Sequence, residues 1–213
     1  MRALGILLGR DLRHEARTWE TSVVVLAMAL MIDLILGFAL PDGTGASGEG
    51  GLLWVAILFP AVLIHGRLWN EGMEAVLTAP VPAWILWFAK FLFALIFTTA
   101  LALVMIPVYL ALLNAAIRGP LVPFLAATLL GVVGLSAVGT SLAALTARLS
   151  HRELLLPIML LPLVVPLFLG LVVLSGWAFG ARAPDHDWLL LLGVFDAVYI
   201  ALPLLLADIL MEG

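Results

Sequence analysis

Few residues in this sequence have the types and spacing that support chemistry. The four histidines, His14, His65, His151 and His186, lie near the ends of predicted membrane spans and far apart in the sequence. They therefore lack the short spacing typical of metal ligands, and we expect each imidazole to be solvated or interfacial. The chain has no cysteine, which excludes disulfides, zinc-thiolate sites and thioether attachment of a haem. The serines and acids form no nucleophile motif. The sequence therefore predicts neither a metal site nor an enzyme.

A phosphate-binding loop is also missing from the sequence. Residues 42–51 are rich in glycine, but no lysine follows them, and Lys90 is the only lysine of the chain. The pattern G-x-x-x-x-G-K-[ST], whose backbone amides and lysine hold the phosphates of ATP, does not occur. We therefore expect no ATP on this chain.

Charges, a pair of prolines and an aromatic cluster occur together only in residues 66–90. Arg67, Glu71 and Glu74 need water or a partner, whereas Trp69 needs an apolar surface. A short helix at the membrane edge satisfies both needs, and a pair of prolines then stops it. The alternative is a plain connecting loop between two spans.

Composition sets the class of protein. Of the 213 residues, 64% are hydrophobic and 11% are charged, whereas a soluble domain is roughly half apolar and about a quarter charged. The sequence therefore predicts a single all-α integral membrane domain over residues 1–213. Long apolar stretches predict six transmembrane helices, at residues 21–41, 52–64, 91–117, 121–147, 154–176 and 188–207.

The basic residues indicate an orientation. In residues 1–19, leucines recur at helical spacing and arginines occupy another side, which predicts an amphipathic elbow helix on the membrane surface. The alternative is an ordinary basic flank on the same side. Eight of the ten basic residues lie on the side of the N-terminus and two on the other, which predicts that both termini are cytoplasmic.

Several residues inside the spans are candidates for a cavity or gate. An acid within a span usually faces the helix bundle, and repeated prolines in one span remove backbone hydrogen bonds that neighbours must replace. These candidates are Asp33, Trp54, Pro157, Pro162 and Pro166. Small residues recur every fourth position in the fourth span, so we expect it to pack centrally.

The stretch around residue 70 resembles a motif of ABC-2-type permeases. In that family the pattern E-G…E…L-x-T-P-V…K follows the second span, and it matches here at Glu71-Gly72, Glu74, Leu77-Thr78, Pro80-Val81 and Lys90. The resemblance implies an ABC-2-type permease fold with an elbow helix, six spans and a cytoplasmic coupling segment at residues 66–84. It also implies contact with a separate ATP-binding subunit. The coupling residues implied are Arg67, Trp69, Asn70, Glu71, Glu74, Arg148, Arg152 and Glu153.

Within these permeases, the chain is most similar to the CcmB family of haem exporter B permeases. Three motifs carry this similarity: Gly51-Leu52-Leu53-Trp54-Val55-Ala56, Arg67-Leu68-Trp69, and the Leu-Leu-Pro-Leu-Val-Val-Pro-Leu run at 160–167. The family's D-G-S-L-E-Q segment is represented only by Gly72-Met73-Glu74-Ala75.

The resemblance implies a role in cytochrome c maturation in the cytoplasmic (inner) membrane, with ATP hydrolysis driving release of a haem-loaded chaperone. Implied partners are a CcmA-like ATPase that holds the ATP, CcmC- and CcmD-like membrane proteins, a CcmE-like haem chaperone and a second copy of the chain. Haem is the implied substrate, and no nucleic acid is expected. The alternative is an ABC-2-type exporter of a drug, lipid or polysaccharide.

Reporter fusions test the predicted orientation. Fusions in three predicted external segments should read external, at Gly45, Arg118 and Arg182. Fusions in the predicted internal segments should read internal, near Glu74, Ser150 and at Gly213. An internal signal at Gly45 would overturn the whole arrangement.

Overall fold

The computed structural model describes residues 2–40, 45–69, 81–147, 149 and 151–207. Within these ranges the chain forms seven helices and no strand, as expected for an all-α protein. The helices are α1 (Arg2–Thr18), α2 (Glu20–Ala39), α3 (Ala46–Arg67), α5 (Ala83–Leu112), α6 (Leu121–Thr146), α7 (Arg152–Phe179) and α8 (Trp188–Leu205).

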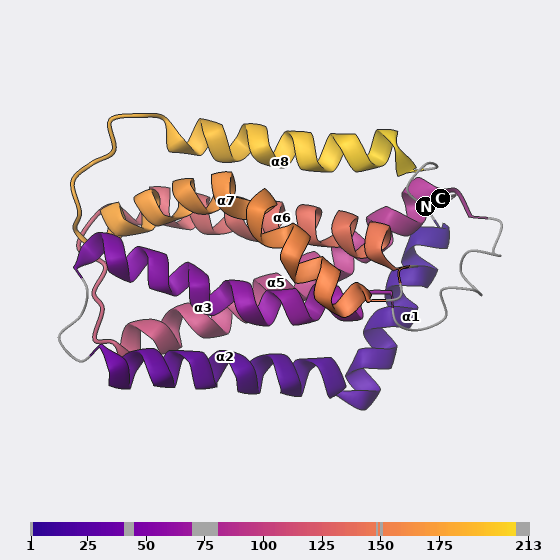
Figure 1. The fold of residues 1–213 in the computed structure, drawn as a ribbon, viewed down its shortest axis with the longest axis horizontal. Coiled ribbons are helices and arrows are strands. Elements are labelled where there is room, and N and C mark those ends of the chain that lie inside the picture. The colour runs from indigo at the N-terminus through magenta and orange to yellow at the C-terminus, as the bar shows by residue number, and fades with distance from the viewer. Residues whose placement is uncertain (1, 41–44, 70–80, 148, 150, 208–213) are drawn as a thin grey trace.

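Six of these helices are long and apolar enough to cross a membrane: α2, α3, α5, α6, α7 and α8. They run side by side, and α1 crosses one end of the bundle at a steep angle to them (Figure 1). The described ends of the chain, at the start of α1 and the end of α8, both lie at that end (Figure 1). We call it the elbow end. The six spans predicted from the sequence are therefore confirmed as helices.

Helix α6 lies at the centre of the bundle, in contact with α3, α5, α7 and α8. Its small residues make this possible. A Cβ on Gly131 would lie 2.6 Å from Cη2 of Trp54, and a Cβ on Gly139 would lie 2.2 Å from the His65 ring. The hydrophobic effect does not drive helices together in lipid. Close van der Waals contact between the helices supplies the attraction instead. The central position expected for this span is confirmed.

Helix α7 carries three prolines and changes direction midway along its length (Figure 1). Each proline lacks an N–H and so breaks the helical hydrogen-bond pattern, which bends the helix. The bent helix packs mainly on α3 and α6. At one contact with α3 the two backbones nearly touch, because a Cβ on Gly50 would lie 2.7 Å from the Gly176 nitrogen.

Several predicted span boundaries are wrong. The second span was expected to begin at residue 52, but α3 already begins at Ala46, and its glycines pack on α7. The third span was expected to begin at residue 91, but α5 begins at Ala83, directly after Pro82. Proline suits a helix start, because its φ is fixed near the helical value and it has no N–H to leave unpaired. The coupling segment expected at residues 66–84 is thus shortened at both ends.

The opposite end of the bundle is closed by a backbone contact. Both Arg118 and Gly119 donate their amide N–H to the carbonyl of Ala178, at 2.9 and 2.8 Å. The fifth span was expected to end at residue 176, but α7 continues to Phe179. Helix α8 then begins after Asp187, whose side chain accepts a hydrogen bond from the Leu190 amide at 3.2 Å.

The contact between α3 and α7 gives a matched pair of substitutions. Gly50→Ala should destabilise the protein, because the new methyl would meet the α7 backbone at 2.7 to 3.1 Å and force the helices apart. A cost of about 1–3 kcal/mol is typical of such overpacking. Gly51→Ala is the control, since its nearest neighbours are Val172 methyl groups at 3.8 Å. Thermal unfolding in detergent measures both, and equal midpoints would contradict the packing described.

Candidate functional site at the elbow end

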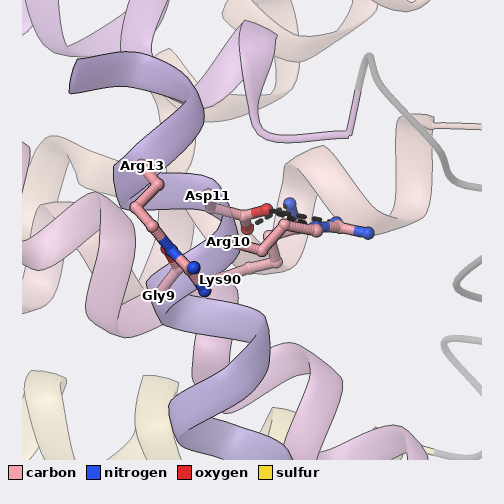
Figure 2. A network of polar contacts seen from close by, with 5 residues as sticks. All are labelled: Gly9, Arg10, Asp11, Arg13 and Lys90. Atoms are coloured by element: carbon pink, nitrogen blue, oxygen red, sulfur yellow. Dashed lines mark hydrogen bonds and ion pairs between the residues drawn. The ribbon is translucent and has the colours of Figure 1, made fainter. Parts of the chain in front are cut away.

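An ion pair joins α1 to the bundle. Nζ of Lys90 on α5 lies 2.7 Å from Oδ2 of Asp11 on α1, and the two side chains are only 9% and 12% exposed. Arg10 donates to the other carboxylate oxygen from Nε at 3.2 Å and Nη2 at 3.1 Å. Figure 2 shows this network, together with Arg13, which donates to the carbonyl of Gly9 at 2.8 Å. A buried ammonium is costly unless it is paired, so Asp11 holds α1 against Lys90.

Lys90 also lies over the end of α3. Its Nζ is 5.9 Å from the centroid of the Trp69 ring, within the range of a cation–π contact. Trp69 follows α3 directly and is 5% exposed. On α5 itself, Trp87 stacks on Phe91 with ring centroids 5.4 Å apart. Lys90 therefore contacts both Asp11 on α1 and Trp69 after the end of α3.

The turn from α1 into α2 is held by Glu15. Trp19 adopts a left-handed conformation with φ 53°, at the point where the chain turns from α1 into α2. Oε1 of Glu15 accepts hydrogen bonds from the amide and the hydroxyl of Ser22, both at 2.7 Å. Burial raises the pKa of Glu15, but the hydrogen bonds from Ser22 and Thr21 outweigh it and lower the pKa overall. The charged carboxylate thus pairs with the first turn of α2 and fixes the elbow.

A cavity of about 880 Å³ lies between α1, the end of α3 and the start of α7. Apolar residues such as Val62, Phe93 and Pro157 line one part of it, and charged residues line the other. Among the charged residues, Arg67 and Glu20 are 3.7 Å apart with side chains 34% and 70% exposed. An ion pair this exposed contributes little to stability. These two charges are therefore open to water and to a partner.

The coupling residues expected from the sequence fall into three groups. Arg67 and Trp69 lie at this end, the first partly exposed and the second buried. Arg152 and Glu153 form the start of α7, whose first turns border the cavity. The remaining four lie outside the described residues: Asn70, Glu71, Glu74 and Arg148.

The residues expected at a cavity or gate are not gathered in one place. Asp33 is fully buried on α2, and neither of its oxygens has a hydrogen-bond partner. Trp54 is fully buried and donates from Nε1 to Oγ of Ser175 on α7 at 2.8 Å. Pro157 lines the cavity at the elbow end, whereas Pro162 and Pro166 lie on the exposed side of α7. A gate formed by these residues stays a prediction.

One histidine departs from its expected position. His14, His151 and His186 are exposed, but His65 is completely buried between α3 and α6. Its burial follows from the glycine opposite, because Gly139 leaves room for the ring. The histidine and the glycine that faces it lie on separate helices, so a single sequence carries no signal of their contact.

Sequence reasoning also missed the partner of Lys90. A lone lysine among aromatic residues indicates that some acid must pair with it, but three acids in residues 1–20 fit equally well. Only the crossing of α1 over α5 selects Asp11. Asp196 on α8 is a further buried carboxylate, 5% exposed, with its Oδ1 against Gly134.

Comparison with known proteins agrees with this architecture. The family model described as CcmB protein matches residues 2–208. Two relatives named heme exporter protein B come from Rhodobacter capsulatus and Paracoccus denitrificans. The first is 34% identical over 173 residues, which are 75% of this chain and 76% of the relative. The second is 33% identical over 184 residues, 82% of this chain and 84% of the relative. A third, from Pseudomonas aeruginosa, is 33% identical over 188 residues, 82% and 83% of the two chains. The chain therefore belongs to the CcmB protein family.

Proposed function

We propose that this chain is the membrane permease subunit of a haem export system that serves cytochrome c maturation. The observation that carries the proposal is the family match over residues 2–208, on a chain with six apolar helices long enough to span a membrane. Relatives that share about a third of their residues over most of their length are named heme exporter protein B. The chain is a transporter subunit rather than an enzyme. Nothing in these comparisons favours an exporter of drugs, lipids or polysaccharides.

We propose that ATP is hydrolysed by a separate, CcmA-like subunit that docks at the elbow end. The sequence lacks a phosphate-binding loop, so the energy must come from another chain. Two charged side chains at the elbow end, Arg67 and Glu20, are 34% and 70% exposed and are suited to contact with a soluble partner. We place both termini and this end of the bundle in the cytoplasm, and the chain in the inner membrane, because eight of ten basic residues lie on this side.

The coupling segment is proposed to pass movement of the ATPase to α1 and α5 together. Trp69, the last described residue before the coupling acids, is buried in the chain's own core rather than presented to a partner. Trp69 lies under Lys90, and Lys90 is paired with Asp11 on α1. A displacement of Trp69 would therefore act on α1, α3 and α5 at once. The acids Glu71 and Glu74 are the proposed contacts with basic residues of the ATPase.

Haem is the proposed substrate of the whole assembly. That assembly would comprise a homodimer of this chain, two ATPase subunits, CcmC- and CcmD-like membrane proteins and a CcmE-like chaperone that carries the haem. The role of this chain is mechanical: ATP hydrolysis on the partner drives a change in the bundle that releases the loaded chaperone. Among the described residues, no group of three or more His, Cys, Asp or Glu side chains is arranged to hold a metal ion.

Purification tests the division between permease and ATPase. Expressed alone, the chain should show no ATP hydrolysis, and co-expressed with the CcmA-like subunit it should be recovered in a complex that hydrolyses ATP. The control is the complex with the phosphate-loop lysine of the ATPase changed to alanine, which should assemble and be inactive. Hydrolysis by the rigorously separated chain would refute the proposed division, and failure to recover any ATPase would refute the proposed assembly.

Substitutions in the coupling segment test its role. Glu71→Ala with Glu74→Ala should reduce cytochrome c maturation while the protein still inserts, because the charges that fix the register with the ATPase are lost. Trp69→Ala should weaken assembly and also lower stability by about 3–5 kcal/mol, since a large buried side chain is removed. Levels of c-type cytochrome and co-purified ATPase are the measurements.

Asp185→Ala is the matched control for the acids, because Asp185 is an exposed carboxylate in the connection between α7 and α8, which lies at the opposite end of the bundle (Figure 1). It should leave both measurements unchanged. Full maturation and normal ATP hydrolysis in the double glutamate variant would show that these acids have no coupling role.

A further inference from the structure

A small cavity lies beside the end of α3 and adjoins the large cavity at the elbow, with which it shares Gly66 and Leu156 as lining residues. Its volume is about 10 Å³, and residues of α3, α6 and α7 enclose it: His65, Gly66, Trp69, Ala143, Thr146, Ala147 and Leu156. A single water molecule needs about 10–15 Å³ when volume is measured in this way. The space is therefore about the size of one water.

Two buried polar atoms belong to residues that line this cavity, and neither has a hydrogen-bond partner. They are Nε2 of His65 and Nε1 of Trp69. His65 is 0% exposed and Trp69 is 5% exposed, so bulk water does not reach them. Buried polar atoms are hydrogen-bonded in the great majority of cases, and two orphans around one cavity call for a common partner.

The hydrogen-bonding roles of the two atoms are opposite. Nδ1 of His65 lies 2.7 Å from the carbonyl oxygen of Ala61, which only accepts, so Nδ1 carries a hydrogen. In the neutral ring Nε2 is then an acceptor. Nε1 of Trp69 is a donor only. A molecule between them must accept from Trp69 and donate to His65, which water does and a metal cation does not.

A third partner is available on α6. The hydroxyl of Thr146 donates to the carbonyl of Leu142 at 2.8 Å, which leaves a lone pair on Oγ1 to accept another hydrogen. Thr146 lines the same cavity. A buried water usually makes about three hydrogen bonds, and this cavity offers one acceptor in His65, one donor in Trp69 and a second acceptor in Thr146.

We propose that this cavity is a binding site for one structural water molecule, held between His65, Trp69 and Thr146. The water connects the residue that follows α3 to α6 through hydrogen bonds that lipid and bulk solvent cannot replace. His65 is thus a positioning residue for Trp69, whose ring also lies under Lys90. This site does not depend on the proposed coupling to an ATPase, because it follows from the described side chains alone.

Proton NMR of the intact chain in lipid nanodiscs, with tryptophan labelled by ¹⁵N at the indole, tests the site directly. The Trp69 signal is assigned by its loss in Trp69→Phe. We expect a cross-peak between the Trp69 indole proton and a long-lived water. The Trp87 indole is the internal control, because it is fully buried and unpartnered but does not line this cavity. A Trp69 indole proton without any water contact would overturn the proposal.

His65→Phe tests the part played by the imidazole, since it keeps a ring and removes the acceptor. The Trp69 water cross-peak should be lost and its indole proton should shift to lower frequency, while the Trp87 signal stays in place. Melting temperatures add a second measurement: His65→Phe with Trp69→Phe should lower the midpoint no more than the larger single change. Persistence of the Trp69 water contact in His65→Phe, or additive losses in the double variant, would refute the bridge. If His65→Phe does not fold, the measurement on the unaltered chain still decides.

Discussion

Close contact between α3, α6 and α7 is the constraint on which the rest of this structure depends. Helices in lipid gain nothing from apolar burial alone, so they must approach until their backbones and small side chains pack. Glycines permit that approach here, at Gly50 against α7 and at Gly131 and Gly139 against α3. Large side chains then occupy the space that the glycines leave. Trp54 fills it at Gly131, and its indole is satisfied by Ser175, so one contact supplies both packing and a hydrogen bond.

The elbow end follows from this packed core. Because α3 and α5 are held in place, Trp69 and Lys90 occupy fixed positions, and Asp11 brings α1 to them. Glu15 then fixes the turn into α2 through Ser22. The result is a junction of α1, α2 and α5 beside Trp69. The proposed coupling to a partner relies on this junction, because a soft attachment would absorb the movement.

The polar residues inside the bundle are of two kinds. Some are paired, as Lys90 is with Asp11 and Trp54 with Ser175. Others, including Asp33 and Asp196, are buried without a hydrogen-bond partner in the chain. In a hydrocarbon environment an unpaired polar group is costly, so these carboxyl groups are positions where the single chain leaves a hydrogen bond unmade. His65 and Trp69 belong to the same class, and the cavity between them offers a specific partner.

The sequence by itself determined the membrane class, the number of spans, the amphipathic α1 and the central place of α6. These properties depend on how each stretch partitions between lipid and water, or on small residues at helical spacing. Both can be recognised in the linear sequence. The family was also evident, through short motifs at the second span, the coupling segment and the fifth span. Only the tertiary structure decided that α5 begins at Ala83, that Asp11 pairs with Lys90 and that His65 is buried. Asp11 and Lys90 are 79 positions apart in the sequence, and Trp54 and its partner Ser175 are 121 positions apart. Contacts of this kind depend on which glycine faces which side chain. Hydropathy reports that a residue leaves water, but only the packing of the helices decides which neighbour replaces the water.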